Sequence, residues 1–537
     1  MTSIDNEKTD NEYEKSTATL TEGFPMITTG KLVMVAASLS LLIFSATLSG
    51  TIISTATNSI SKSFGTDNIS WVAQSFLIIS TALQPAWGKL SDIFGCRPPV
   101  LIGIVILLSF SVLAGLSVNM LMLIISRAFM GVGASACVAM VNIIISEMVP
   151  IQIRGEYMGV ISAANGVGQV IGPLIGGIIS ENISWRWTMF VNIPVILIAS
   201  VPVYFLVKLP SPSGSFKSKI LDVDFKGIFI LVLSITLILV GVDFGSKQSW
   251  GIPKSYLLIS FGMIFLVLFL LVEYRTKRDP IISLCLFTYR NVSLNLIGAL
   301  VTGYVMYVGI FFIPELFIAL YNISSTSAGV NTWPWMVCVI FASVSSGIAI
   351  SKLNIYIPFL WVGSGLLVVG FGLMCTVNTE TAYAKIAGFI SIIGLGIGLR
   401  MPSSTISAQV AVTKEELAQT TALLNFFRNM GGILGLSISK AVLISVFNDK
   451  TEPYHEQYPE YKEILKTISG GSSKEIFKIS ELSLQNELVA IYVKTLKIIF
   501  MICSVIAVVG LVASLFIKNI SIENEASKKD LEEHLYD

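Results

Sequence analysis

The chain has 537 residues, of which 53% are hydrophobic and only 13% are charged. Because a soluble domain carries about 25% charged residues, this composition excludes an ordinary soluble protein and predicts several membrane spans. The formal net charge of +1, without any basic stripe, indicates no nucleic-acid partner. The two histidines and six scattered cysteines have no metal-ligand spacing, so we expect neither a metal nor a cofactor.

The polar segment 1–31 is expected to be a disordered cytosolic tail. Apolar runs then follow one another almost to the C-terminus, and each has roughly the 20 residues needed to cross a bilayer. The runs are continuous rather than alternating, which predicts an all-α polytopic bundle of 14 helices and excludes a barrel. The runs lie near residues 32–55, 70–88, 99–118, 120–141, 156–180, 187–207, 226–244, 256–273, 292–320, 330–350, 357–376, 385–409, 419–447 and 490–517.

Polar segments divide these runs into two six-helix halves around a central helix pair. Such a plan indicates an internal repeat, which is common among secondary transporters. The expected parts are an N-terminal half at 32–207, a cytosolic linker at 208–225, the central pair at 226–273, a C-terminal half at 292–517 with a long non-cytosolic loop at 448–489, and a cytosolic tail at 518–537.

The lysines and arginines of the short loops lie mostly on one side of the predicted membrane, which the positive-inside rule assigns to the cytosol. Both termini are therefore expected to be cytosolic. The opposite short loops hold only Lys62, Arg186, Lys247, Lys254 and Lys385.

The short loop after the second run reads Gly88-Lys-Leu-Ser-Asp92-Ile-Phe-Gly95-Cys-Arg97. Such a loop must turn sharply, and Gly88 and Gly95 permit the turn. A plain basic hairpin would also contain an arginine. The pattern Gly-x-Leu-x-Asp-x-x-Gly-x-Arg is more specific than that alternative.

Arg127 lies inside the fourth run, about 7 residues or ~10 Å from the start of its helix. A buried arginine is costly in hydrocarbon and normally faces a cavity or a partner. An arginine that snorkels to the interface is the alternative, and the depth favours a functional role.

The fifth run contains small residues about four apart, which let two helices approach closely. Pro173 kinks this helix and removes a backbone hydrogen bond. Plain helix packing explains part of the pattern, and a movable seam between helices explains the same residues. The seam residues are Gly168, Gly172, Pro173, Gly176 and Gly177.

Four motifs in order, at 88–97, 127–133, 166–177 and 185–194, resemble those of the major facilitator superfamily, in its 14-span drug:proton antiporter branch. The resemblance covers about residues 32–517, and Arg428 belongs to a weaker echo of it. Fungal vacuolar basic-amino-acid transporters and fungal toxin-efflux pumps share this layout.

The resemblance implies roles for several residues. Gly88, Asp92, Gly95 and Arg97 would form a cytosolic conformational latch between the halves. Arg127 would belong to the proton-coupling machinery, and the glycine-rich fifth helix would be the antiporter seam.

The chain departs from the family pattern in the first span, where Ser49 replaces the usual acid. Arg400 is an unexpected charge in the twelfth span. Its depth differs from that of Glu315 by roughly 15 Å, so we expect Arg400 to line the cavity towards the cytosol rather than to pair with Glu315. Arg428 is assigned to the same substrate and proton pathway.

Glu315 is the acid placed deepest in an apolar run, and no histidine lies in the spans. Burial raises the pKa of a carboxyl group, so we predict that Glu315 carries the proton. The alternative is a solvated and inert carboxylate at the outer interface.

We therefore predict a proton-coupled antiporter that works by alternating access on cationic small solutes, with basic amino acids moved into the vacuole as the favoured substrate. Efflux of toxic organic cations across the plasma membrane is the alternative. A solute receptor that transports nothing is disfavoured, because the tails are too short for a signalling domain. No cluster of catalytic groups indicates an enzyme. The expected partners are the substrate, protons and the lipid bilayer, with the protein as a monomer.

Overall fold

The computed structural model describes residues 29–65, 70–209, 219, 223–248, 253–275, 282–414 and 416–522. Within these ranges the chain forms helices and connecting turns, and no β-strand. The expected tails at 1–31 and 518–537, and the linker at 208–225, fall largely outside the described residues.

The N-terminal helices begin with two apolar runs that are each divided into two helices. The run at 70–88 becomes α4 and α5, because Pro85 lies in the first turn of α5 and has no N–H to continue the preceding ladder. The helices are α2 (Thr29–Thr51), α3 (Ile53–Phe64), α4 (Ser70–Ala82), α5 (Gln84–Phe94), α6 (Arg97–Gly115), α7 (Met120–Met148), α8 (Ile151–Asn182), α9 (Trp187–Phe190) and α10 (Asn192–Leu206).

The remaining helices form a central pair and a second large group. The pair is α12 (Phe225–Gln248) and α13 (Pro253–Arg275). The second group is η1 (Leu284–Phe287), α14 (Arg290–Tyr321), α15 (Ser325–Val330), α16 (Trp333–Leu353), α17 (Ile357–Met374), α18 (Tyr383–Gln409), α19 (Leu417–Gln457), η2 (Pro459–Tyr461), α20 (Lys462–Ser469), η3 (Ser473–Lys478) and α21 (Leu482–Leu515).

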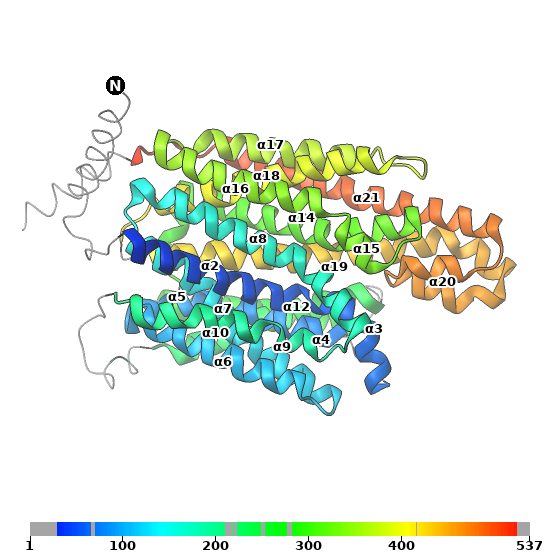
Figure 1. Ribbon diagram of the computed structural model, residues 1–537, viewed down its shortest axis with the longest axis horizontal. Helices are drawn as coiled ribbons and strands as arrows, with labels where there is room; N and C mark the ends of the chain where they lie inside the picture. The colour runs from blue at the N-terminus through cyan, green and yellow to red at the C-terminus, as the bar shows by residue number, and fades with distance from the viewer. Residues whose placement is uncertain are drawn as a thin grey trace, which may run out of the picture.

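The helices run side by side in one elongated bundle (Figure 1). In the described chain, 13 helices are long and apolar enough to cross a membrane, and the shorter helix Trp71–Ala82 is also apolar. The predicted all-α membrane bundle is therefore confirmed. We call the end with the turn between α5 and α6 the basic end, and the end with α20 the cap end.

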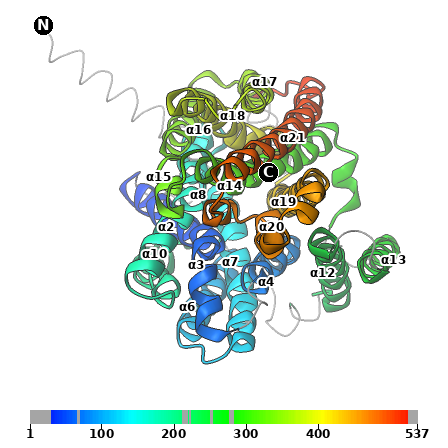
Figure 2. The same cartoon turned by 90° about the vertical axis from the view of Figure 1, so that its right-hand side faces the viewer.

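Seen along the bundle, α2–α10 lie on one side and α14–α21 on the other (Figure 2). We call these groups the N-half and the C-half. Each has its own buried apolar core, with Leu39 and Met140 in the first and Phe371 and Phe500 in the second. Each core is built mainly from the helices of its own half, and Ala418 of α19 adds to the N-half core.

The central pair lies against one flank of the bundle (Figure 2). α12 contacts both halves, because one apolar cluster joins Ile78 of α4, Leu239 of α12 and Leu424 of α19. The Gln74 amide donates to the Asp243 carboxylate beside this cluster. α13 packs on α12 and exposes most of its apolar side chains, as expected of a helix that faces lipid.

The expected polar loop at 448–489 is mostly helical. α19 continues to Gln457, α21 already begins at Leu482, and residues 458–481 fold as a compact element that we call the cap. Its apolar side chains recur at helical spacing and are buried on the C-half, which explains why the segment folds. These side chains are Leu465, Ile468, Ile476 and Ile479.

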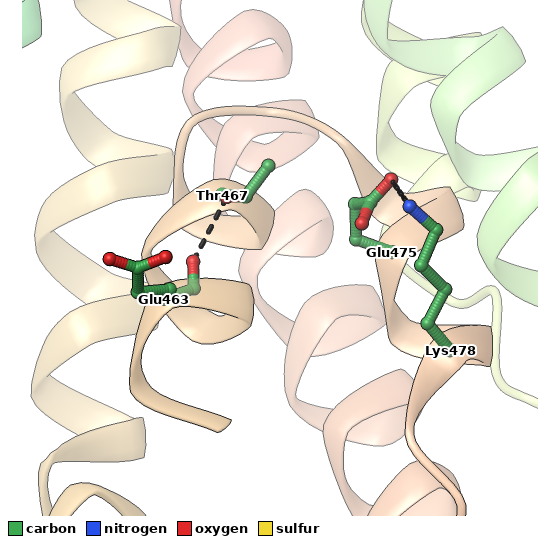
Figure 3. A network of polar contacts seen from close by, with 4 residues as sticks. All are labelled: Glu463, Thr467, Glu475 and Lys478. Atoms are coloured by element: carbon green, nitrogen blue, oxygen red, sulfur yellow. Dashed lines mark hydrogen bonds and ion pairs between the residues drawn. The ribbon is translucent and has the colours of Figure 1, made fainter. Parts of the chain in front are cut away.

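The outer surface of the cap carries local polar contacts only a few residues apart (Figure 3). The Thr467 hydroxyl donates to the Glu463 carbonyl at 2.9 Å. The Lys478 ammonium lies 2.8 Å from the Glu475 carboxylate. Both contacts lie within the cap, so they stabilise its turns rather than its attachment to the bundle.

Candidate functional site

A polar cavity of about 40 Å³ lies between the two halves, near the middle of the bundle. Helices α2, α4, α5, α7 and α8 line it from the N-half, and α14 and α19 line it from the C-half. The lining residues are Ala46, Thr47, Gly50, Thr51, Phe76, Leu77, Ser80, Gln84, Ala134, Ser135, Val138, Asn165, Gln169, Tyr307, Asn425, Arg428 and Asn429.

Arg428 of α19 supplies the charge of this cavity. Its side chain is only 6% exposed, and its Nη1 donates to the Asn425 Oδ1 at 3.2 Å. Its Nε has no hydrogen-bond partner. In the described chain no carboxylate forms an ion pair with it. A buried guanidinium without a counter-charge is costly, so Arg428 is a candidate group for contacting a polar ligand.

Other buried polar groups of the lining are also incompletely bonded. The Gln169 Nε2 donates to the Asn165 Oδ1 at 2.7 Å, while the Gln169 Oε1 has no partner. The Gln84 Oε1 and the Asn425 Nδ2 likewise have none. Since buried polar groups are normally hydrogen-bonded, these groups make the cavity the candidate binding site of the described chain.

Arg127 and Ser49, both predicted for the proton or substrate pathway, are brought together inside the N-half. The Arg127 guanidinium donates to the Ser49 carbonyl at 2.8 Å and to the Val72 carbonyl at 3.1 Å. Its Cζ lies 4.5 Å from the centre of the Phe76 ring. Phe76 lines the cavity and Arg127 does not, so Arg127 lies behind the cavity wall.

Arg400 does not line the cavity, contrary to our expectation. It is buried within the C-half, where its Nη1 donates to the Ser364 hydroxyl and, at 3.4 Å, to the Gly510 carbonyl. The guanidinium fits beside Gly298, where the Cβ of any other residue would collide with it. The helix rotation that turns Arg400 away from the N-half could not be read from hydropathy alone.

Glu315 is also absent from the cavity wall. It follows Tyr307, which does line the cavity, by eight residues of α14, or ~12 Å along a helix. Its carboxylate accepts from the Ser473 hydroxyl at 2.6 Å and from the Ser473 N–H at 3.3 Å. Glu315 is half-buried, and the cap contacts its carboxylate, so the alternative of a carboxylate surrounded by solvent alone does not describe it.

The glycines of α8 lie on two faces of the helix. A Cβ on Gly168 would lie 2.7 Å from the Phe44 carbonyl oxygen. Gly172 and Gly176 face Thr51 and Ile52 in the same way. These three predicted seam residues therefore pack against helices of the N-half.

The other face of α8 makes the contact with the C-half. A Cβ added to Gly155 would lie 2.6 Å from the Gly347 carbonyl oxygen. A Cβ added to Gly159 would lie 2.6 Å from the Ser343 carbonyl oxygen. Gly177 is the predicted seam residue on this face. A Cβ added to it would lie 2.9 Å from the Thr326 hydroxyl oxygen.

Pro173, the remaining predicted seam residue, lies within α8. Its carbonyl accepts from the Thr55 hydroxyl of α3 at 2.8 Å. Pro173 therefore contacts the N-half, like Gly168, Gly172 and Gly176.

The predicted latch motif reaches the other half through two of its four residues. The Asp92 carboxylate accepts from the Gln419 amide of α19 at 3.2 Å. A Cβ on Gly88 would lie 2.8 Å from the Ala422 Cβ. Gly95 has a φ of 81°, which favours glycine at this turn.

Arg97, the fourth residue of the motif, stays within the N-half. Its Nη2 donates to the Tyr204 carbonyl of α10 at 2.8 Å, and its Cζ lies 5.2 Å from the centre of the Tyr204 ring. Arg97 therefore holds α6 to α10, and its assignment to a contact between halves is corrected.

A second polar contact between the halves, missed from the sequence, is centred on Gln409 of α18. Its Nε2 donates to the Ser146 hydroxyl at 2.9 Å and to the Thr421 hydroxyl at 3.0 Å. Its Oε1 accepts from the Arg154 guanidinium at 3.2 Å. Gln409 thereby joins α7 and α8 of the N-half to α18 and α19 of the C-half at the basic end.

The sequence carried a signal for the missed residues. Asn165 and Gln169 are four apart in one apolar run, and Asn425 and Asn429 are four apart in another. Polar pairs at this spacing share a helix face, and in a membrane helix such a face points to the protein interior.

The described residues include no group of three or more His, Cys, Asp or Glu side chains placed to hold a metal ion.

The sequence and the fold are similar to known membrane transporters. The family model described as Major Facilitator Superfamily matches residues 39–436. The multidrug transporter protein MdtP of Bacillus subtilis is 30% identical over 525 residues, covering 91% of this chain and 93% of its own. The efflux pump dotC of Dothistroma septosporum is 28% identical over 447 residues, covering 83% of this chain and 77% of its own.

A solved structure has a similar fold. It is a bacterial homologue of the human lysosomal transporter Spinster, in an inward-facing and unoccupied conformation. The TM-score is 0.54 at 15% identity, and the match covers 91% of this chain and 98% of that one. These similarities extend across both halves of the bundle.

Proposed function

Because the chain belongs to the major facilitator superfamily, we propose that it exports small organic solutes across a membrane by alternating access. The cavity between the halves is the substrate site in this proposal. Transport then requires the halves to separate first at one end of the bundle and then at the other.

The observation that carries the proposal is the position of the cavity relative to the polar contacts between the halves. Asp92 of α5 and Gln419 of α19 join the halves at the basic end. Arg154 of α8 and Gln409 of α18 join them at the same end. In this proposal these contacts close the path from the basic end to the cavity, and breaking them opens it there.

We favour export over the uptake of basic amino acids into a vacuole. The similar proteins are named as a multidrug transporter and an efflux pump. The cavity has Arg428 as its charged residue, and none of its lining residues is an aspartate or glutamate that would attract a lysine or arginine substrate. The plasma membrane is the proposed location, with the basic end cytosolic because short basic loops remain inside.

Flux through the purified protein tests this proposal. The full chain in proteoliposomes should move at least one member of a panel made of a cationic, an anionic and a neutral fluorescent solute. Protein-free vesicles give the background rate. If no solute of the panel moves faster than this background rate, the proposal is contradicted.

Proton coupling is a further part of the proposal, with Glu315 as its carrier. Glu315 lies in a spanning helix that also lines the cavity, so a change in its charge could be passed along α14. We expect Glu315→Gln to abolish transport driven by a pH gradient and Glu315→Asp to keep part of it. Glu463→Gln, which alters an exposed carboxylate of the cap, is the matched control.

Ser473→Ala separates the proton role from attachment of the cap, because it removes a hydrogen bond to Glu315 and leaves the carboxylate in place. Transport driven by a pH gradient should survive this change if Glu315 carries the proton. Equal loss in Ser473→Ala and Glu315→Gln would show that Glu315 only holds the cap.

A further inference from the structure

We propose that the central cavity binds an organic anion, with Arg428 as the group that receives its negative charge. The inference rests on the proposed transport function and names the chemical class of its substrate. Four features of the cavity carry it: an unpaired charge, free hydrogen-bond donors, the sign of the surrounding charge and an apolar wall.

The first feature is the guanidinium of Arg428. Its one hydrogen bond goes to the neutral Asn425 Oδ1 at 3.2 Å, and its Nε has no partner. Among the residues that the structure describes, no carboxylate compensates its charge. A guanidinium presents its N–H groups in a planar fork that matches a carboxylate, sulfonate or phosphate group.

The second feature is the set of polar groups around Arg428. The Asn425 Nδ2, one helical turn away, is a buried donor without an acceptor. Tyr307 lies within electrostatic range of Arg428 and lines the same cavity. An anionic group bound here would therefore accept hydrogen bonds from Arg428, Asn425 and Tyr307 together.

The third feature is the sign of the charge around the cavity. None of the lining residues is an aspartate or glutamate. Arg400 is buried in the C-half within electrostatic range of Arg428, and Arg127 lies behind Phe76 on the opposite wall. Neither is ion-paired to a carboxylate of the described chain. At low dielectric these positive charges repel a cation and attract an anion.

The fourth feature is the apolar part of the wall. Phe76, Leu77 and Val138 line the cavity from the N-half, opposite Arg428. This division suits a molecule with an apolar body and one negative group. The present volume of about 40 Å³ holds only a few waters, so such a molecule enters only when the halves move apart.

Two dyes with a similar ring system and opposite charge test the inference. Fluorescein is an anion at pH 7.5 and rhodamine 123 is a cation. The full chain in proteoliposomes should transport fluorescein with saturation, and rhodamine 123 should compete weakly. Fluorescence anisotropy on the detergent-purified protein measures binding of each dye without requiring transport.

Arg428→Gln should weaken fluorescein binding by about 10- to 100-fold, as expected for the loss of a charge-assisted hydrogen bond. Arg428→Lys should retain part of the affinity, because it keeps the charge without the fork. Lys385→Gln removes an exposed positive charge at the start of α18 and should leave binding unchanged. The melting temperature of each variant shows whether it is folded.

Two outcomes would overturn the inference, and a third would contradict transport alone. Transport of rhodamine 123 without binding of fluorescein would leave the proposed transport function intact and reject the anion. Equal fluorescein affinity in folded Arg428→Gln and wild-type protein would reject Arg428 as the anion site. Saturable fluorescein binding without flux of any dye would instead support the site and contradict transport.

Discussion

At the scale of single residues, the structure shows how an arginine is accommodated inside a membrane bundle by neutral groups. Arg127 is the clearest example, because two backbone carbonyls accept its hydrogen bonds and an aromatic ring covers it. One of these carbonyls belongs to Ser49. The Ser49 hydroxyl accepts a separate hydrogen bond from the Asn192 amide at 2.9 Å, so the backbone of Ser49 contacts Arg127 and its side chain contacts Asn192.

Small residues are equally decisive at this scale, and Gly155 gives a direct test. Gly155→Ala would place a Cβ 2.6 Å from the Gly347 carbonyl, so α8 and α16 must separate. We expect the variant to lose about 1–3 kcal/mol of stability and to melt at a lower temperature in detergent.

The control for Gly155 is Gly388→Ala in α18. Gly388 is exposed and a Cβ there meets no atom within 4 Å. Alanine also has the higher helix propensity, so this variant should melt at the same or a higher temperature. Equal melting of the two variants would contradict close packing between α8 and α16.

At the scale of elements, the cap shows how a segment outside the apolar runs acquires a defined structure. Its buried face packs on the C-half through Leu465 and Ile476. Ser473 adds a polar attachment through three hydrogen bonds to Glu315, two to its carboxylate and one to its backbone carbonyl. The contacts on its outer surface (Figure 3) join residues within the cap and add nothing to that attachment.

Ser473→Ala should therefore loosen the cap. The change deprives a partly buried carboxylate of a 2.6 Å hydrogen bond, which costs about 1–3 kcal/mol when a buried group loses its partner. Hydrogen exchange followed by mass spectrometry should show faster exchange in peptides from 458–481.

Lys478→Ala is the matched control within the cap. It removes the contact with Glu475, and the lysine side chain is 64% exposed. Such surface ion pairs contribute little to stability, so exchange should stay as in the wild type. Faster exchange in the lysine variant alone would show that the surface contact, rather than Glu315, holds the cap.

At the scale of the whole molecule, two separately packed halves meet around the cavity, and the basic end holds them together. Gln409 is central there, because its amide bonds to three partners on three helices of both halves. α12 adds an apolar contact to α4 and α19 on one flank. The relative positions of the halves thus depend on these polar contacts, on the apolar cluster around α12, and on the close packing of α8 on α16 at Gly155 and Gly159.

Gln409→Leu should shift the molecule towards a conformation that is open at the basic end. Leucine has a similar size and cannot bond to Ser146, Arg154 or Thr421. Spin labels replacing the exposed Lys208 and Lys352, one in each half, would measure the separation in a background without the native cysteines. We expect the distribution of distances between the two spin labels to shift towards longer values in the variant.

The control for this measurement is Gln457→Leu at the end of α19, an exposed position near the cap. Its distance distribution should match that of the parent protein. An unchanged distribution in Gln409→Leu as well would mean that Gln409 does not govern closure of the basic end.

The sequence alone determined that the chain is a helical membrane bundle. Hydropathy reports how each run partitions into a bilayer, and that is a property of composition over about 20 residues. The sharp turn at Gly95 was also predictable, because its geometry is local. The close packing around the glycines of α8 was predictable in kind, since small residues mark helix contacts.

The tertiary structure alone decided which polar residues face the cavity. Arg400 and Arg428 are both arginines within apolar runs, and only the rotation and packing of their helices place Arg428 at the cavity and Arg400 inside the C-half. Gly168 and Gly177 were likewise indistinguishable until α8 acquired neighbours on both faces. The environment of Glu315 depends on Ser473, 158 residues away along the chain. Such contacts arise from packing between distant segments, which composition and periodicity within one segment do not specify.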